Sequence, residues 1–207
     1  MLLAHKENLR VARSQRGFTL IEVLVTFVVL AIGLLGIVSL QALSKTSQHQ
    51  GIQRTRAVAI ADGMLEKIRI NPAGLATYAI GLNPLGDGTI SSEPTPNCIS
   101  AVCNTTQMAA HDLWQWEQAL DGTTVTVGGV ATAGLINPQA CVIFTAATGK
   151  TNTGLLQVLV QWSDLRETID AVQAGDVDVA CGGAAAGGDR FRRKVTASTF
   201  VIDEDEL

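Results

Sequence analysis

The chain has 207 residues, with 15 Lys and Arg against 19 Asp and Glu, and a formal charge of −4. This acidic balance argues against nonspecific nucleic-acid binding as the main activity, because such binding depends on Lys and Arg neutralising phosphates. Aromatic residues make up only 4 %, so we expect a loop-rich domain with a modest core.

The first feature along the chain is a basic stretch, 1–17, followed by a long apolar run. From Phe18 to Leu40 the only ionisable side chain is Glu22. A helix of about 20 apolar residues is long enough to cross the hydrocarbon core of a bilayer. We therefore predict one membrane span at 18–40, with the basic flank kept on the cytoplasmic side. The charged residues of the stretch are one acid and four bases: Glu7, Lys6, Arg10, Arg13 and Arg16.

Glu22 needs a partner wherever it is removed from water, because a buried, unpaired carboxylate is costly. Cleavage after Gly17 would expose an α-amino group on Phe18, four residues from Glu22. The two charges can meet within one helix. They can also meet between neighbouring chains and fix the axial offset of packed helices. A third interpretation is a glutamate that only stabilises the N-terminus of its own helix.

The segment 17–22, Gly-Phe-Thr-Leu-Ile-Glu, resembles the prepilin processing signal of type IV pilins and type II secretion pseudopilins. The resemblance implies that a prepilin peptidase cuts after Gly17 and that Phe18 is N-methylated. It also implies that Glu22 pairs with the N-terminus of a neighbouring subunit. An ordinary signal anchor that contains a glutamate is the alternative. Without its leader the chain would carry 11 basic against 18 acidic side chains.

The helical pattern continues beyond the span as an amphipathic stretch, 41–71, that ends before Pro72. We predict one helix from Phe18 to Asn71, its first half forming the membrane or filament core and its second half the spine of a globular head, 72–207. The head begins with an irregular segment that runs to Thr106 and holds four of the five prolines.

A short helix is predicted at 108–120, with apolar residues on one face. Adjacent helix residues point to different faces, so we interpret His111 and Asp112 as a solvated His beside an acid rather than a catalytic pair. Trp114 lies off the apolar face, where it can line a contact surface. The apolar face holds Leu113, Trp116 and Leu120.

The remainder of the head is predicted to be strands in an antiparallel meander, with one face covered by the long helix. Alternation in the third strand directs Leu156, Val158, Val160 and Trp162 to one face and the glutamines to the other. The fold class is therefore α+β, and the resemblance implies the type IV pilin fold. The predicted strands are Thr124–Val127, Cys141–Thr145, Leu155–Trp162 and Phe191–Ile202.

Four cysteines on the translocated side suit two disulfides in an oxidising periplasm. Cys98 and Cys103 can close a small loop of their own. Cys141 begins a strand whose antiparallel partner ends at Trp162, so the following loop emerges at the same end of the sheet. Cys181 lies in that loop, and the predicted pairs are Cys98–Cys103 and Cys141–Cys181. The spacing does not suit a zinc site.

The other charged segments are interpreted as solvated. The region Val172–Asp189 reads as a flexible loop rather than a calcium site, since its Asp176, Asp178 and Asp189 fit no EF-hand spacing. The acidic tail Asp203–Glu206 is expected to be disordered. No motif indicates a cofactor, a metal or a Ser or Cys nucleophile, so we expect no enzymatic activity. The histidines are His5, His49 and His111.

A finer resemblance lies in the spine end, 61–72, together with Cys98, Cys103, Asp112-Leu113 and Trp116. These residues are similar to PilV-type minor pilins, also described as type IV pilus modification proteins. The resemblance implies a minor pilin that primes pilus assembly and sits near the tip. One alternative is the I-type minor pseudopilin of type II secretion. Another is a membrane-anchored periplasmic binding or adhesive module that never polymerises.

The same resemblance implies the partners and the location of the chain. The partners would be other minor pilins, the major pilin, the prepilin peptidase, the inner-membrane assembly platform and a tip adhesin, with no nucleic acid. Before assembly the chain would cross the inner membrane once and carry its head in the periplasm. After assembly it would belong to the fimbrium at the cell surface, with roles in adhesion and twitching motility.

Overall fold

The computed structural model describes residues 17–207 apart from gaps at 124, 132–133, 168–180 and 183–189. The chain divides into two compact units, Met1–Lys45 and Thr46–Leu207. The predicted leader lies outside the described residues except for Gly17.

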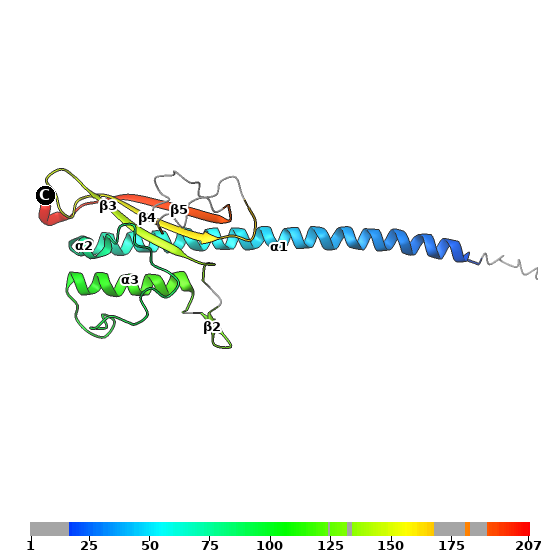
Figure 1. Cartoon of the computed structure of the whole chain (residues 1–207), viewed down its shortest axis with the longest axis horizontal. Helices are drawn as coiled ribbons and strands as arrows, with labels where there is room; N and C mark the ends of the chain where they lie inside the picture. Colours follow the sequence, from blue (N-terminus) through cyan, green and yellow to red (C-terminus); the bar gives the residue numbers. More distant parts are fainter. Residues whose placement is uncertain (1–16, 124, 132–133, 168–180, 183–189) are drawn as a thin grey trace, which may run out of the picture. The chain divides into compact units, whose positions relative to one another are not determined.

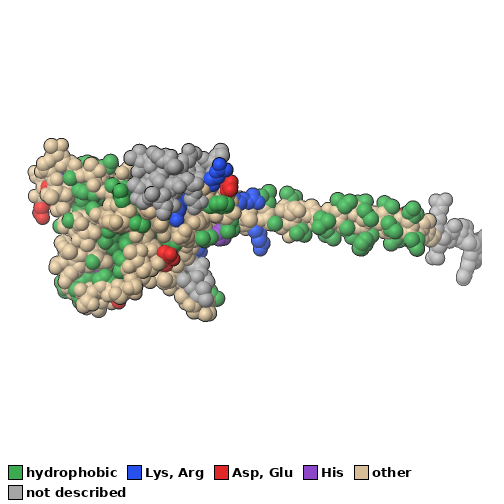
Figure 2. All heavy atoms as spheres, in the orientation of Figure 1, with side chains coloured by type: hydrophobic (Ala, Val, Ile, Leu, Met, Phe, Trp, Pro, Cys, Tyr) green, Lys and Arg blue, Asp and Glu red, His purple; other side chains and the backbone are tan. Residues whose placement is uncertain are grey.

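Helix α1 (Leu20–Ile70) contributes its first half to the first unit and its second half to the second. It starts two residues after the predicted Phe18 and ends one residue before Asn71. The first half is exposed except for the half-buried Ala31. Among the described residues α1 is the one helix long and apolar enough to cross a membrane. Figure 2 shows hydrophobic side chains along the visible face of this segment.

The hydroxyl groups in the apolar half of α1 are satisfied within the helix. Thr26 Oγ1 donates to Val23 O at 2.9 Å, and Ser39 Oγ donates to Leu35 O at 3.0 Å. A polar group without a partner is costly in a medium without water. These two side chains therefore do not disqualify the helix as a membrane span.

The second half of α1 packs into the core of the second unit through one face. Two alanines on this face, Ala57 and Ala61, are fully buried, whereas Ile52 is 52 % exposed. The buried residues of α1 are Gln53, Ala57, Ala61, Met64, Leu65 and Ile68.

The predicted irregular segment after α1 contains a 3-10 turn, η1 (Pro72–Gly74), and one turn of helix, α2 (Leu75–Tyr78). Helix α3 (Thr105–Asp121) follows and starts three residues before the predicted 108–120. The reason is a capping box, in which Asn104 Oδ1 accepts from Gln107 N and Gln107 Oε1 accepts from Asn104 N. Gly122, in the left-handed conformation, ends α3.

The main sheet has three antiparallel strands in the order β3 (Gln139–Ala146), β4 (Gly154–Ser163) and β5 (Arg192–Val201). Figure 1 shows these strands lying over the later part of α1, with α3 alongside. The predicted fold class, α+β with a long helix packed on an antiparallel sheet, is confirmed.

The predicted strand at 124–127 does not join this sheet. Its residues Thr126–Val127 form β1, which pairs with β2 (Val130–Ala131) in a separate hairpin. Gly128 and Gly129 both have positive φ, as two-residue hairpin turns require. The place beside β3 is taken by Leu85, which exchanges two backbone hydrogen bonds of 2.8 Å with Ala140.

Strand β4 buries the predicted face, with Leu156, Val158, Val160 and Trp162 all in the main core. Its other face is also partly covered, because Leu159 packs against the Cys141–Cys181 disulfide. Gln161 follows the predicted alternation and lies on this other face, but it is buried as well.

The C-terminal tail is ordered, which corrects the prediction of disorder. Glu204–Glu206 form a 3-10 turn, η4, that is held against the turn between β3 and β4. Glu206 Oε1 accepts from Thr151 N at 2.7 Å and from Asn152 N at 2.9 Å. Asp203 is buried and accepts from Asn152 Nδ2 at 2.9 Å. Backbone donors in the turn, which sequence reading did not reveal, therefore fix this acidic tail.

Candidate functional site: the N-terminal motif and the surfaces of the second unit

Residues Gly17–Thr19 lead into α1 in an exposed, non-helical conformation. Thr19 caps the helix, because Glu22 N donates to Thr19 O at 3.1 Å and to Thr19 Oγ1 at 3.3 Å. Thr-Leu-Ile-Glu is the sequence pattern of a capping box, a signal that the sequence analysis overlooked. Glu22 therefore occupies the third helical position, where the helix dipole favours a negative charge.

The carboxylate of Glu22 makes no ion pair or hydrogen bond with another described residue. The segment also exposes most of its apolar side chains: Phe18, just before the helix, is 83 % exposed, and Leu20 and Phe27 in the helix are 83 % and 71 % exposed. A surface of this size needs lipid or neighbouring helices to cover it. The segment thus combines an available carboxylate with an apolar surface that no described residue covers.

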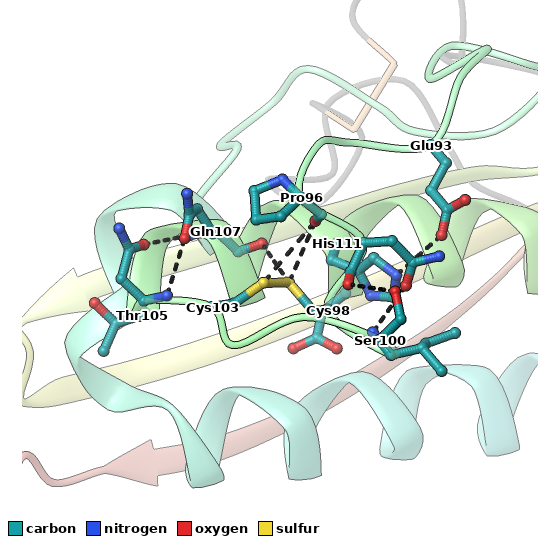
Figure 3. Close-up of a disulfide and its surroundings, with 12 residues drawn as sticks. Glu93, Pro96, Cys98, Ser100, Cys103, Thr105, Gln107 and His111 are labelled. Carbon is teal, nitrogen blue, oxygen red and sulfur yellow. Dashed lines mark hydrogen bonds and ion pairs between the residues drawn. A yellow bond between two sulfur atoms is a disulfide. The ribbon is translucent and has the colours of Figure 1, made fainter.

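In the second unit Cys98 is bonded to Cys103, with Cα atoms 5.6 Å apart, so the expected pairing is present. Figure 3 shows this disulfide beside the start of α3 and close to Pro96. The loop that it closes exposes two large apolar side chains, Ile99 at 75 % and Val102 at 99 %. The disulfide therefore holds an apolar loop at the surface.

His111 is buried, at 2 % exposure, which corrects the expectation of a solvated side chain. Its Nε2 lies 3.4 Å from Glu93 Oε1, a contact visible in Figure 3. Its ring centroid lies 5.6 Å from that of Trp114. The irregular segment folds back over α3 and covers the histidine, and helix periodicity alone could not indicate this.

Asp112 is also buried, because three elements converge on it. Tyr78 from α2 donates its hydroxyl to Asp112 Oδ2 at 2.5 Å, and Lys67 from α1 lies 3.0 Å from Asp112 Oδ1. Burial, followed by the hydrogen bond to Asp112, raises the pKa of Tyr78 well above its ordinary value. Neither His111 nor Asp112 faces the other in these contacts, so the two do not form a catalytic pair.

Two further carboxylates on α3 hold the 86–90 turn and were not identified from the sequence. Glu117 is fully buried and accepts from Ile90 N at 2.6 Å and from Gly86 N at 3.3 Å. One helical turn later, Asp121 accepts from the amides of Asp87 and Gly88 at 2.8 and 3.0 Å. These acids satisfy backbone donors and are structural.

The remaining sequence predictions concern the second cysteine pair and the region Val172–Asp189. Cys141 is bonded to Cys181, the second expected pair. Of the region Val172–Asp189, only Cys181 and Gly182 are described, so the predicted solvated loop with Asp176, Asp178 and Asp189 lies outside the described residues. In the part of the chain that the structure describes, no group of three or more His, Cys, Asp or Glu could hold a metal ion.

Two family models match adjacent parts of the chain, which together cover residues 12–114. Residues 12–38 match the prokaryotic N-terminal methylation motif, and residues 39–114 match the family described as type IV pilin Tt1218. The second match ends inside α3, so all the strands lie beyond the matched residues. No curated protein and no solved structure matches the chain significantly.

Proposed function

We propose that the chain, which matches a type IV pilin model over 39–114 and the methylation motif over 12–38, is a type IV pilin, and more closely a minor pilin that helps to start assembly of a type IV pilus and stays near its tip. The family is structural, and we propose no catalytic role for the chain. The observation that carries the proposal is an exposed apolar helix that bears the methylation motif and continues into a separate compact unit.

The N-terminal chemistry follows from the motif. We propose that prepilin peptidase cuts between Gly17 and Phe18 and that the new N-terminus of Phe18 is methylated. The methylated amine would be cationic near neutral pH, since α-amino groups have a pKa of about 7.7–8.0. In a filament this cation would pair with Glu22 of a neighbouring subunit. The capping contact of Thr19 uses the backbone of Glu22 and leaves its carboxylate available for that partner.

We propose that the chain is first a membrane-anchored subunit and then part of the pilus. Before assembly the apolar half of α1 anchors it in the inner membrane, with the second unit in the periplasm. During assembly lipid around α1 is replaced by helices of the major pilin and of other minor pilins on the assembly platform. Two disulfides in the second unit are consistent with an oxidising compartment.

A minor pseudopilin of type II secretion is the second candidate, since the methylation motif occurs in both classes. The match over 39–114 is to a family described as a type IV pilin, and this favours the pilus. A membrane anchor that never polymerises would need neither the motif nor the unpaired Glu22.

The decisive experiment is deletion of the gene in the source bacterium, followed by complementation. We expect fewer surface pili with an unchanged cellular pool of major pilin, and the chain itself in sheared pili at a small fraction of the major subunit. A defect in protein secretion with normal pili would assign the chain to the secretion system instead. Normal piliation and normal secretion would contradict both assignments.

A further inference from the structure

A pocket of about 330 Å³ lies in the second unit, between α1 and one end of the main sheet. Ser47, Gln50, Gly51 and Arg54 line it from α1, and their spacing of three or four residues places them on one helix face. The sheet side is made by Trp162 at the end of β4 and by Arg193 and Lys194 at the start of β5.

Hydrogen-bond donors predominate in the described lining. The described lining contains three cationic side chains and one carboxylate, that of Asp164. That carboxylate is engaged, because Asp164 Oδ2 lies 2.9 Å from Arg193 Nε. Arg54 is exposed and forms no hydrogen bond or ion pair with another described residue in any contact that the structure gives. Arg54 is therefore a cationic donor in the described lining, whereas Arg193 is paired with Asp164.

Trp162 provides a second, independent observation that points to a ligand in this pocket. Its side chain is only 3 % exposed, yet its Nε1 has no hydrogen-bond partner among the described residues. The indole N–H can only donate. A buried donor without an acceptor is unfavourable and calls for an explanation. An acceptor bound in the pocket that Trp162 lines would supply one.

We propose that this pocket binds a phosphate group, held by Arg54 and the indole N–H of Trp162. Guanidinium groups bind phosphate oxygens with two parallel hydrogen bonds, and the indole adds a third donor. The phosphate can come from a phospholipid headgroup or from a free phosphate ion. The site does not depend on the role of the chain in a pilus.

The test uses the full chain in dodecyl maltoside micelles with ¹⁵N-labelled tryptophan, and the Trp162 indole signal is assigned by its loss in Trp162→Phe. Sodium phosphate is titrated at constant ionic strength in one arm, dioleoyl phosphatidylglycerol in the second, and dioleoylglycerol, which has no phosphate, in the third. We expect a saturable shift of the Trp162 signal in at least one of the first two arms and none in the third.

Arg54→Gln should weaken this binding about tenfold, as expected for loss of one charge-assisted contact. Arg56→Gln is the matched control, because it removes the same charge from the same helix outside the pocket lining, and it should change the affinity less than twofold. Saturation by the lipid alone identifies a headgroup site, and saturation by free phosphate identifies an anion site. No saturable shift in either arm, or equal weakening by the two variants, would overturn the proposal.

Discussion

At the scale of single residues, Thr19 and Glu22 illustrate how one local contact serves two purposes. The Thr19 hydroxyl accepts from the Glu22 amide and fixes the start of α1. The Glu22 carboxylate stays free of partners within the described chain and is positioned by the cap. The same four residues can thus fix the helix start and present a charge to another subunit.

The first prediction concerns processing at Gly17. Replacing Gly17 by Leu should leave an unprocessed precursor, because the peptidase must accommodate the residue before the cut. The structure has no atom within 4 Å of a Cβ at Gly17, so the substitution would not disturb the folded chain itself. Gly36→Leu, at an equally open position, is the control and should be processed normally. Mass spectrometry of the N-terminus in cells with active peptidase reads out both, and a native chain still starting at Met1 would contradict the cleavage.

The second prediction concerns Glu22. Glu22→Val should be processed normally but incorporated poorly into pili, because the Phe18 amine of a neighbour loses its carboxylate partner. Thr26→Val is a control one turn later, since the Thr26 hydroxyl is satisfied by its own helix. Immunoblots of sheared pili and of membranes distinguish incorporation from expression. Normal piliation with Glu22→Val as the only copy, in a strain without related minor pilins, would exclude the register role.

At the scale of elements, the main feature is how the second half of α1 is tied to α2 and α3. Asp112 contacts Tyr78 and Lys67, and Trp116 Nε1 donates to Ile60 O at 3.1 Å. These contacts connect residues 34 to 56 positions apart. They explain why a charged residue on a short helix is buried rather than solvated.

The third prediction compares a buried and an exposed ion pair. Asp112→Ala should lower the free energy of unfolding by about 2–4 kcal/mol, because it leaves the buried Tyr78 hydroxyl without its acceptor and removes the charge that pairs with Lys67. Glu66→Ala should cost less than about 1 kcal/mol, because its pair with Arg69 is exposed. Urea denaturation of the full chain in micelles, followed by tryptophan fluorescence, measures both, since all three tryptophans lie in the second unit. Equal costs would contradict the structural role of Asp112.

The fourth prediction concerns the pH dependence of the tail. Partial desolvation acts to raise the pKa of Glu206, but hydrogen bonds from the Asn152 amide, the Thr153 hydroxyl and Thr151 outweigh it and lower the pKa from 4.5 to about 2. A depressed native pKa stabilises the fold above the unfolded pKa, and this contribution is lost as the pH falls from about 4.5 towards 2. The Thr151 and Asn152 amide signals should therefore shift with a midpoint near pH 2 in the native chain. In Glu206→Gln this transition should be absent, and a midpoint near 4.5 in the native chain would contradict the docked tail.

At the scale of the whole molecule, the two disulfides constrain very different lengths of chain. Cys98 and Cys103 are five positions apart, and Cys141 and Cys181 are 40 apart. In the chain-entropy model the stabilisation grows with the length of the closed loop. The second bridge also packs against Leu159, so its loss removes buried contacts.

The fifth prediction follows from this difference. Replacing Cys141 and Cys181 by Ala should lower the free energy of unfolding by about 4 kcal/mol, and replacing Cys98 and Cys103 by about 2 kcal/mol. Denaturation under non-reducing conditions measures the two double variants against the native chain. Peptide mapping without reductant checks the pairing, and a peptide joining Cys103 to Cys141 would contradict both the pairing and the strand order.

The sequence by itself determined the long helix, the order of β3, β4 and β5, the buried face of β4 and the processing motif. Each depends on a short-range pattern: apolar length, alternation with period two, or a fixed spacing around Gly17 and Glu22. The expected cysteine pairing also followed from strand order, because antiparallel strands return to the same end of a sheet.

Only the tertiary structure decided the burial of His111, Asp112 and Gln161, the docking of the acidic tail and the place of Leu85 beside β3. In each case the partner is a backbone group or side chain far along the chain, such as Tyr78 for Asp112 or Thr151 for Glu206. A polar residue can be expected to be exposed to solvent only when no residue far along the chain forms a hydrogen bond with it. Hydrogen bonds between residues far apart in the sequence therefore determine these features, and local sequence patterns do not reveal such partners.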